Sequence, residues 1–216
     1  MEGVVRLTRI YTRTGDDGTT GLGDFSRTRK TDPRLVAYAD VNEANAALGV
    51  AVALERAGAA TGGAGGLDTD ALAVLQRVQN DLFDVGADLC LPLKPEYAHP
   101  PLRVRAGWIE ELEADCDRYN DQVPALTSFI LPGGTVTAAQ LHVATTVVRR
   151  AERSAWRAVE EYGTGDDDGV NPLTAAYLNR LSDLLFILAR YANRAAGDVL
   201  WQPGGGRAEP PSSRSR

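Results

Sequence analysis

The residues with the clearest capacity for chemistry form a glycine-rich segment near the start of the chain, residues 11–24, which reads YTRTGDDGTTGLGD. Glycine is costly in a helix, and threonine and aspartate favour caps and turns, so the segment predicts an irregular loop. Such a loop can bend tightly and present backbone N–H groups and hydroxyls to an anion. Its glycine spacing matches neither the P-loop nor the dinucleotide-binding fingerprint. An unusual phosphate-binding loop and a frayed polar terminus both fit these residues.

A second group of candidates lies on two predicted helices. Arg149, Glu152 and Arg153 stand at positions i, i+3 and i+4 of the first, so they share a face. Two guanidinium groups beside a carboxylate could grip a triphosphate while the carboxylate orients Mg²⁺. A solvated face with internal ion pairs has the same pattern. Asn179 and Asp183 lie one turn apart on the second helix, where they either contact a ribose, a base edge or a metal, or form a polar stripe opposite the core leucines.

The remaining aromatic, histidine and cysteine residues give weaker signals. Phe129 begins the run FILPGG, in which a turn ends an apolar stretch, and its residue type alone predicts a core side chain. His99 and His142 are too few, and too badly spaced with Cys90 and Cys116, to predict a zinc site. Local chemistry therefore indicates only a protein that could bind a polyphosphate.

Composition limits the class of protein. The 216 residues suit one domain, and the 44% hydrophobic content is ordinary for a globular protein with a real core. A net charge of −6 disfavours nonspecific nucleic-acid binding. Two cysteines imply no disulfide framework. The chain has no apolar run near eighteen residues and no charged leader, so we expect neither membrane insertion nor export, and a cytoplasmic protein.

The apolar residues that must position these candidates repeat with helical periodicity. They predict an all-α, five-helix bundle in a single domain over residues 32–198, with no convincing strand pattern outside the short run ending at Leu131. Asp32 and Asn171, each followed by proline, predict helix starts. The predicted helices cover about 33–57, 69–91, 104–120, 137–162 and 172–196.

Three stretches fall outside these helices. Residues 1–31 would form an irregular glycine-rich loop segment before the bundle. Residues 58–66 predict a flexible glycine-rich linker. Residues 199–216, rich in proline, glycine, serine and arginine, predict a disordered tail.

Taken together, the motifs resemble the PduO-type ATP:cob(I)alamin adenosyltransferases, or corrinoid adenosyltransferases. The resemblance runs from about residue 10 to residue 193, and five motifs follow in the family's order, which is far more specific than any one of them. It implies a homotrimer of five-helix bundles with active sites between subunits. The matching segments are YTRTGD at 11–16, DPR with AY at 32–38, FILPGG at 129–134, RRAER at 149–153 and LNRLSD at 178–183.

The resemblance also implies a reaction. The Co(I) of reduced cobalamin attacks the 5′ carbon of ATP, which gives adenosylcobalamin and triphosphate, with Mg²⁺ held near Glu152. Phe129 would lie against the lower corrin face and keep the axial ligand from cobalt. Arg149, Asn179 and Asp183 complete the implied catalytic set. The implied nucleotide-binding residues are Thr12, Arg13, Thr14, Gly15, Asp16, Gly18, Thr19, Thr20, Lys30, Arg149, Glu152, Arg153 and Asn179.

Two departures from the family pattern bear on this expectation. Family members commonly have lysine where this chain has Asp17, whose carboxylate would face either solvent or Mg²⁺. Many members also have an aspartate and an arginine that bridge subunits where this chain has Asn42 and Thr145, and a hydrogen bond between these two could substitute. The resemblance further implies a reductase and an adenosylcobalamin-dependent mutase as partners. A non-enzymatic module that binds and delivers adenosylcobalamin is the alternative function.

Overall fold

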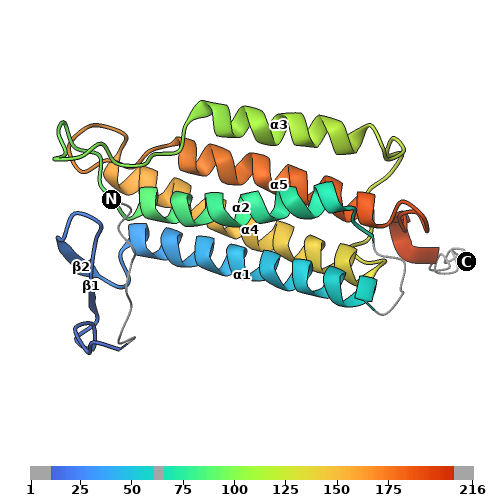
Figure 1. Cartoon of the computed structure of the whole chain (residues 1–216), viewed down its shortest axis with the longest axis horizontal. Coiled ribbons are helices and arrows are strands. Elements are labelled where there is room, and N and C mark those ends of the chain that lie inside the picture. The colour runs from blue at the N-terminus through green and yellow to red at the C-terminus, as the bar shows by residue number, and fades with distance from the viewer. Residues whose placement is uncertain (1–10, 61–65, 207–216) are drawn as a thin grey trace, which may run out of the picture.

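The computed structural model describes residues 11–60 and 66–206, which form five long helices and one short β-hairpin (Figure 1). The all-α five-helix bundle predicted from the sequence is confirmed. The helices are α1 (Pro33–Ala60), α2 (Thr69–Leu89), α3 (Ala106–Asn120), α4 (Val136–Tyr162) and α5 (Leu173–Ala192). The strands β1 (Thr19–Gly21) and β2 (Arg27–Arg29) are antiparallel, and a 3₁₀ turn, η1 (Pro203–Gly206), follows α5.

The bundle core lies where α1, α4 and α5 meet. Helix α4 packs against both α1 and α5, while α2 covers α1 and α3 covers α5 (Figure 1). Each helix directs an apolar face inward, and Leu48, Leu141 and Leu185 are fully buried. Burial of such side chains is the main favourable contribution to the folding of a helical bundle. Across the described ranges, no helix is long and apolar enough to cross a membrane.

Side-chain caps explain where the helices begin. Asp32 Oδ1 accepts the N–H of Arg34 at 2.8 Å, so the predicted start of α1 is confirmed. Asn171 Oδ1 accepts the N–H of Leu173 at 3.1 Å, and α5 begins there. Helix α5 ends at Ala192 rather than near residue 196, because the chain turns at Asn193, whose carboxamide bonds the loop before α4.

The segments outside the helices differ from the prediction in two places. The hairpin was not predicted, because each strand has only three residues and these are mostly polar. The expected disordered tail is wrong for its first residues, since Leu200 forms an antiparallel bridge with Ile130. These residues are ordered because 199–201 form a short apolar segment whose backbone hydrogen-bonds to residues 129–131.

The predicted linker and the tail lie only partly within the described residues. Helix α1 continues through Ala60, beyond the expected start of the linker at residue 58. Residues 61–65 and 207–216 lie outside the described residues. Gly66 packs tightly against the end of α5, where an added Cβ would lie 2.8 Å from the carbonyl oxygen of Ala192.

Candidate functional site

The glycine-rich loop consists of tight turns that lead into the hairpin. The N–H of Asp16 donates to Arg13 O at 3.3 Å, and the N–H of Gly18 donates to Gly15 O at 3.2 Å. Arg13 and Gly18 both have positive φ, at 62° and 80°. Thr12 Oγ1 lies 2.9 Å from Thr14 Oγ1, so hydroxyls and turn amides occupy one short exposed stretch. This arrangement suits contact with an anion.

Lys30 lies directly against this loop. The N–H of Lys30 donates to Gly18 O at 2.9 Å, which follows from the pairing of β1 with β2. A Cβ added to Gly15 would lie 3.0 Å from both Lys30 Nζ and Thr19 O, so only glycine fits there without a shift. The sequence alone did not show this contact, and it brings an ammonium group to the turn amides.

Asp17 has a structural role inside the loop. Its Oδ1 accepts the N–H of Thr19 at 2.9 Å and the Thr19 hydroxyl at 2.7 Å, and it lies 3.8 Å from Arg27 Nη2. The hydrogen bonds from Thr19 lower the pKa of the Asp17 carboxyl. Arg27 also donates to Thr14 O at 2.7 Å and to the Thr19 hydroxyl. Asp17 therefore helps to hold a cation, Arg27, beside the loop.

Contacts at Gly23 and Asp24 attach the turn of the hairpin to the end of α2 and the loop that follows it. The N–H of Gly23 donates to Cys90 O at 3.0 Å, at the end of α2. Asp24 forms an ion pair with Lys94 and accepts the Ser26 N–H at 3.0 Å. Burial raises the pKa of the Asp24 carboxyl, but the hydrogen bonds from Lys94 and Ser26 outweigh it and lower that pKa to about 2. Asp24 is thus charged and bonded at neutral pH.

Three of the predicted helical residues, Arg149, Glu152 and Asn179, lie at the junction of α4 and α5. Asn179 Nδ2 donates to Glu152 Oε1 at 3.2 Å, and Arg149 Nε donates to Ser182 Oγ at 3.4 Å. Asp183, one turn after Asn179 on α5, instead forms an ion pair at 3.1 Å with Arg180, which also pairs with Glu113 on α3. Arg149 and Asn179 are exposed, so the cluster is open to a ligand. Of the other predicted residues, Arg153 is exposed one turn after Arg149 on α4.

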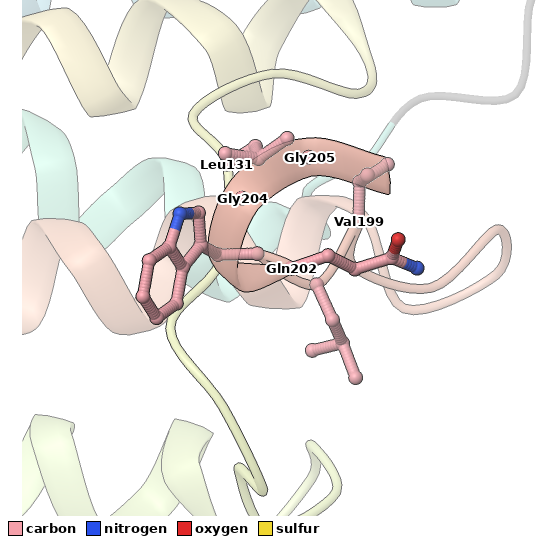
Figure 2. A pocket seen from close by; sticks show the side chains of 7 residues that line it. Leu131, Val199, Gln202, Gly204 and Gly205 are labelled. Atoms are coloured by element: carbon pink, nitrogen blue, oxygen red, sulfur yellow. The ribbon is translucent and has the colours of Figure 1, made fainter. Parts of the chain in front are cut away.

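Phe129 is exposed rather than buried in the core. Its side chain is 78% exposed, which contradicts the expectation from residue type. Its ring lies edge-to-face against Trp201, with centroids 6.1 Å apart. Beside this pair is a pocket of about 640 Å³, formed mostly by the C-terminal residues (Figure 2). Figure 2 shows Leu131, Val199 and Gln202 gathered around the η1 turn.

The hairpin that follows the glycine-rich loop lies at one end of the bundle (Figure 1). Thr28 and Tyr162 both donate to Asp32 Oδ2 at 2.6 Å, so the hairpin lies at the C-terminal end of α4. Phe129 instead precedes the N-terminal end of that helix. Because α4 has 27 residues, it spans ~40 Å. A single chain therefore does not bring the loop and Phe129 together.

Asn42 and Thr145 do not interact with each other within this chain. Thr145 is buried, and its hydroxyl donates to Leu141 O at 2.9 Å within α4. Asn42 is partly exposed on α1. Within the part of the chain that the structure describes, these two residues share no hydrogen bond. A direct bond between Asn42 and Thr145 is therefore not formed within one subunit.

Sequence reasoning missed three contributors to these sites. Ser182 lies inside a motif that had been noted, but only the structure shows that it accepts a bond from Arg149. Arg27 lies in the short polar sequence SRTR, and no pattern in the sequence indicated its contact with Asp17. Trp201 follows Val and Leu, and this apolar triplet was a signal that the tail composition obscured.

The sequence and fold match known proteins along almost the whole chain. The sequence model of the cobalamin adenosyltransferase family matches residues 10–192. A corrinoid adenosyltransferase of Mycobacterium tuberculosis is 60% identical over 94% of this chain and 97% of its own length. A cobalamin adenosyltransferase of Cupriavidus metallidurans is 44% identical over 91% of this chain and 96% of its own.

A solved structure agrees with these relatives. It is a variant of the PduO-type ATP:corrinoid adenosyltransferase from Lactobacillus reuteri, complexed with cobalamin and ATP. It has 32% identity and a TM-score of 0.75, and the match covers 90% of this chain and 97% of that one. The bundle thus has the fold of the PduO-type adenosyltransferases. The chain belongs to the cobalamin adenosyltransferase family.

Proposed function

We propose that the protein transfers the 5′-deoxyadenosyl group of ATP to the Co(I) of reduced cobalamin, giving adenosylcobalamin and triphosphate, at a site shared between subunits of a homotrimer. The family match and the high identity to corrinoid adenosyltransferases support the activity. The observation that supports a corrin site is the exposure of Phe129. Its aromatic ring is 78% exposed and lies edge-to-face with Trp201. An exposed aromatic held in this way favours a flat apolar ligand surface such as a corrin.

The polar residues support the binding of the triphosphate. The exposed hydroxyls of Thr12 and Thr14, with Lys30 and Arg27 beside the loop, would contact phosphate oxygens at one end. Arg149 would contact them from a neighbouring subunit, where its fork of donors suits phosphate. These groups stabilise the negative charge that develops on the departing triphosphate. They also hold the 5′ carbon in line with cobalt.

Glu152 is the residue that fits Mg²⁺. Among the described residues, no group of three or more His, Cys, Asp and Glu side chains could hold a metal ion. A single carboxylate is nevertheless compatible with Mg²⁺, which commonly takes one or two carboxylates together with substrate phosphates and water. The bond from Asn179 holds Glu152 on the exposed face beside Arg149. When bound there, Mg²⁺ would neutralise triphosphate charge.

Phe129 would act on the other substrate. Its ring has no lone pair to donate, so it can fill the space below the corrin without binding cobalt. Loss of the lower axial ligand lowers the electron density on the metal and eases its reduction from Co(II) to Co(I). Asn179 and Asp183 would complete the nucleotide side from α5.

The distance along the bundle supports shared sites. The loop and Phe129 lie at opposite ends of a helix that spans ~40 Å, so loops and helices from neighbouring subunits would have to meet. We further propose that the assembly is a homotrimer in the cytoplasm, supplied by a reductase and serving an adenosylcobalamin-dependent mutase. Light scattering of the purified protein would test the oligomeric state.

An anaerobic assay with ATP and chemically reduced cobalamin tests the activity. We expect ATP-dependent formation of adenosylcobalamin with release of triphosphate. The alternative, a module that only binds and delivers adenosylcobalamin, predicts tight corrinoid binding with no turnover. The cluster of Arg149, Glu152 and Asn179 favours turnover, because storage requires no triphosphate site. A folded, ATP-binding oligomer that forms no adenosylcobalamin would overturn the proposal.

A further inference from the structure

The segment that holds Phe129 is paired with the end of the chain. The N–H of Trp201 donates to Phe129 O at 2.7 Å, and the N–H of Leu131 donates to Val199 O at 2.8 Å. Between them, Leu200 bridges Ile130 in antiparallel pairing. Residues 199–201, called the C-terminal edge segment below, therefore run alongside the residue that carries the exposed ring.

Side chains also connect the two segments. The rings of Phe129 and Trp201 meet edge-to-face with an interplanar angle of 69° and centroids 6.1 Å apart. Ser128 Oγ donates to Trp201 O at 3.0 Å, which adds a contact on the other side of Phe129. Phe129 is 78% exposed and Trp201 is 44% exposed, so neither ring is explained by packing in the bundle core.

The residues between Phe129 and α4 form no helix or strand that would hold Phe129 in place. Pro132, Gly133 and Gly134 separate it from α4, and Gly134 has a φ of 98°. The Phe129 carbonyl and the Leu131 N–H are both bonded to the C-terminal edge segment, since Phe129 O accepts from Trp201 and the Leu131 N–H donates to Val199 O. The direction in which the Phe129 ring points is therefore set largely by its contacts with residues 199–201.

We propose that Trp201 is a positioning residue for Phe129, and that the C-terminal edge segment holds the phenylalanine ring ready to occupy the lower face of the corrin. This inference rests on the proposed function of Phe129. A ring held in place before the substrate arrives loses less rotamer freedom on binding than a free one. Trp201 would thereby raise the fraction of bound cob(II)alamin that lacks a lower axial ligand, without itself contacting cobalt.

The test compares three variants of the full chain. Trp201→Ala removes the edge-to-face contact, and Trp201→Phe retains an aromatic edge. Phe83→Ala is the control, since it removes an aromatic side chain that is 70% exposed on α2, away from Phe129. The first readout is the fraction of four-coordinate Co(II), measured by electron paramagnetic resonance on protein saturated with ATP and cob(II)alamin.

The second readout is turnover from two starting states. With cob(II)alamin and a reduced flavin as electron donor, we expect Trp201→Ala to lower the rate at least fivefold. With preformed cob(I)alamin, the loss should stay within twofold. Trp201→Phe should recover most of the four-coordinate fraction, and Phe83→Ala should match the wild type in both assays.

Three results would overturn the inference. Trp201→Ala could retain the wild-type four-coordinate fraction, it could lose the two activities equally, or Trp201→Phe could fail to recover the signal while folding normally. Failure of the proposed function is distinct, because it would appear as wild-type protein that forms no adenosylcobalamin from cob(I)alamin. A melting curve for each variant separates local positioning from general loss of structure.

Discussion

Arg149 and Arg150 are neighbours in the chain, yet their guanidinium groups contact different helices. Arg149 Nε donates to Ser182 Oγ on α5 at 3.4 Å. Arg150 Nε lies 3.5 Å from Asp40 Oδ1 on α1, and Arg150 Nη2 also pairs with Glu43. Consecutive helical residues point about 100° apart, so one arginine belongs to the candidate site and the other to the packing of α4 on α1.

Because the two arginines have different contacts, Arg149→Ala should lower activity strongly and Arg150→Ala should not. Arg149→Ala should lower kcat/KM about a hundredfold or more, because it removes a charged donor from the developing triphosphate. Arg149→Lys should recover only part of the activity, since lysine keeps the charge but lacks the fork of donors. Steady-state kinetics with varied ATP would measure both variants.

Arg150→Ala is the matched control. Its ion pairs are partly exposed, so the free energy of unfolding should fall by about 1 kcal/mol or less. Turnover should stay within about twofold of the wild type, as for a surface substitution away from the site. An Arg150 variant that loses as much kcat/KM as the Arg149 variant would refute the assignment of the two side chains.

Replacing Asp17 with lysine should impair the loop. Asp17 accepts the N–H and the hydroxyl of Thr19 and lies 3.8 Å from Arg27. Lysine has no acceptor for these donors, and its charge would repel Arg27. We therefore expect Asp17→Lys to raise the KM for ATP several-fold, with Asp17→Asn intermediate because its amide oxygen still accepts. A lower KM in Asp17→Lys would show that the missing cation matters more than the turn.

Attachment of the hairpin should depend on pH through Asp24. Its pKa is lowered to about 2 in the folded chain, against about 3.9 for a free aspartate, so the Lys94 pair stabilises the docked hairpin above about pH 4. That contribution is lost as the pH falls through the folded pKa. Hydrogen exchange of the Gly23 amide reports docking, because this N–H donates to Cys90 O.

The measurement is the ratio of Gly23 protection factors in wild type and Asp24→Asn. We expect the wild type to be better protected by a constant factor from pH 5 to pH 7, and the ratio to fall as the solution is made more acidic than pH 4. Asp166→Asn, at an exposed loop position, serves as the control and should leave Gly23 protection unchanged. A ratio that does not vary between pH 3 and pH 7 would contradict this role of the Asp24 carboxylate.

Much of the fold could be predicted because the helices are determined by local signals. Asp32 caps α1 as its sequence indicates, and the leucine spacing on α5 places that helix in the core. The end of α5 could not be predicted, since it depends on a contact between Asn193 and Gly133, 60 residues away. The C-terminal edge segment was missed for the same reason, because its partners lie at 129–131.

The candidate site, too, could be predicted only in part from the sequence. Spacing along one helix placed Arg149 and Glu152 on a shared face, and the motif order then indicated Asn179 as their neighbour. Loop contacts such as that of Lys30 with Gly15 depend on strand pairing that three polar residues do not reveal. The exposure of Phe129 was also hidden, because residue type alone favours burial for an aromatic side chain.

The loop that carries Phe129 should depend on Gly134. Asn193 holds this loop from the other side, since its Nδ2 donates to Gly133 O at 2.9 Å and its Oδ1 accepts the Thr135 N–H at 2.9 Å. Gly134 has a φ of 98°, and an added Cβ would lie 2.2 Å from Asn193 Oδ1. Gly134→Ala should therefore displace the carboxamide and lower the free energy of unfolding by about 2–3 kcal/mol, measured by urea denaturation.

Gly107→Ala is the matched control for this glycine. Gly107 lies in the first turn of α3, and an added Cβ there would meet no atom within 4 Å. Because alanine is the better helix former, this variant should be unchanged or more stable by up to about 1 kcal/mol. Gly134→Ala should in addition slow turnover from cob(II)alamin more than turnover from cob(I)alamin, since the displaced Asn193 no longer fixes the loop before α4. Equal stability of the two variants would show that the Asn193 contacts do not hold the Phe129 loop.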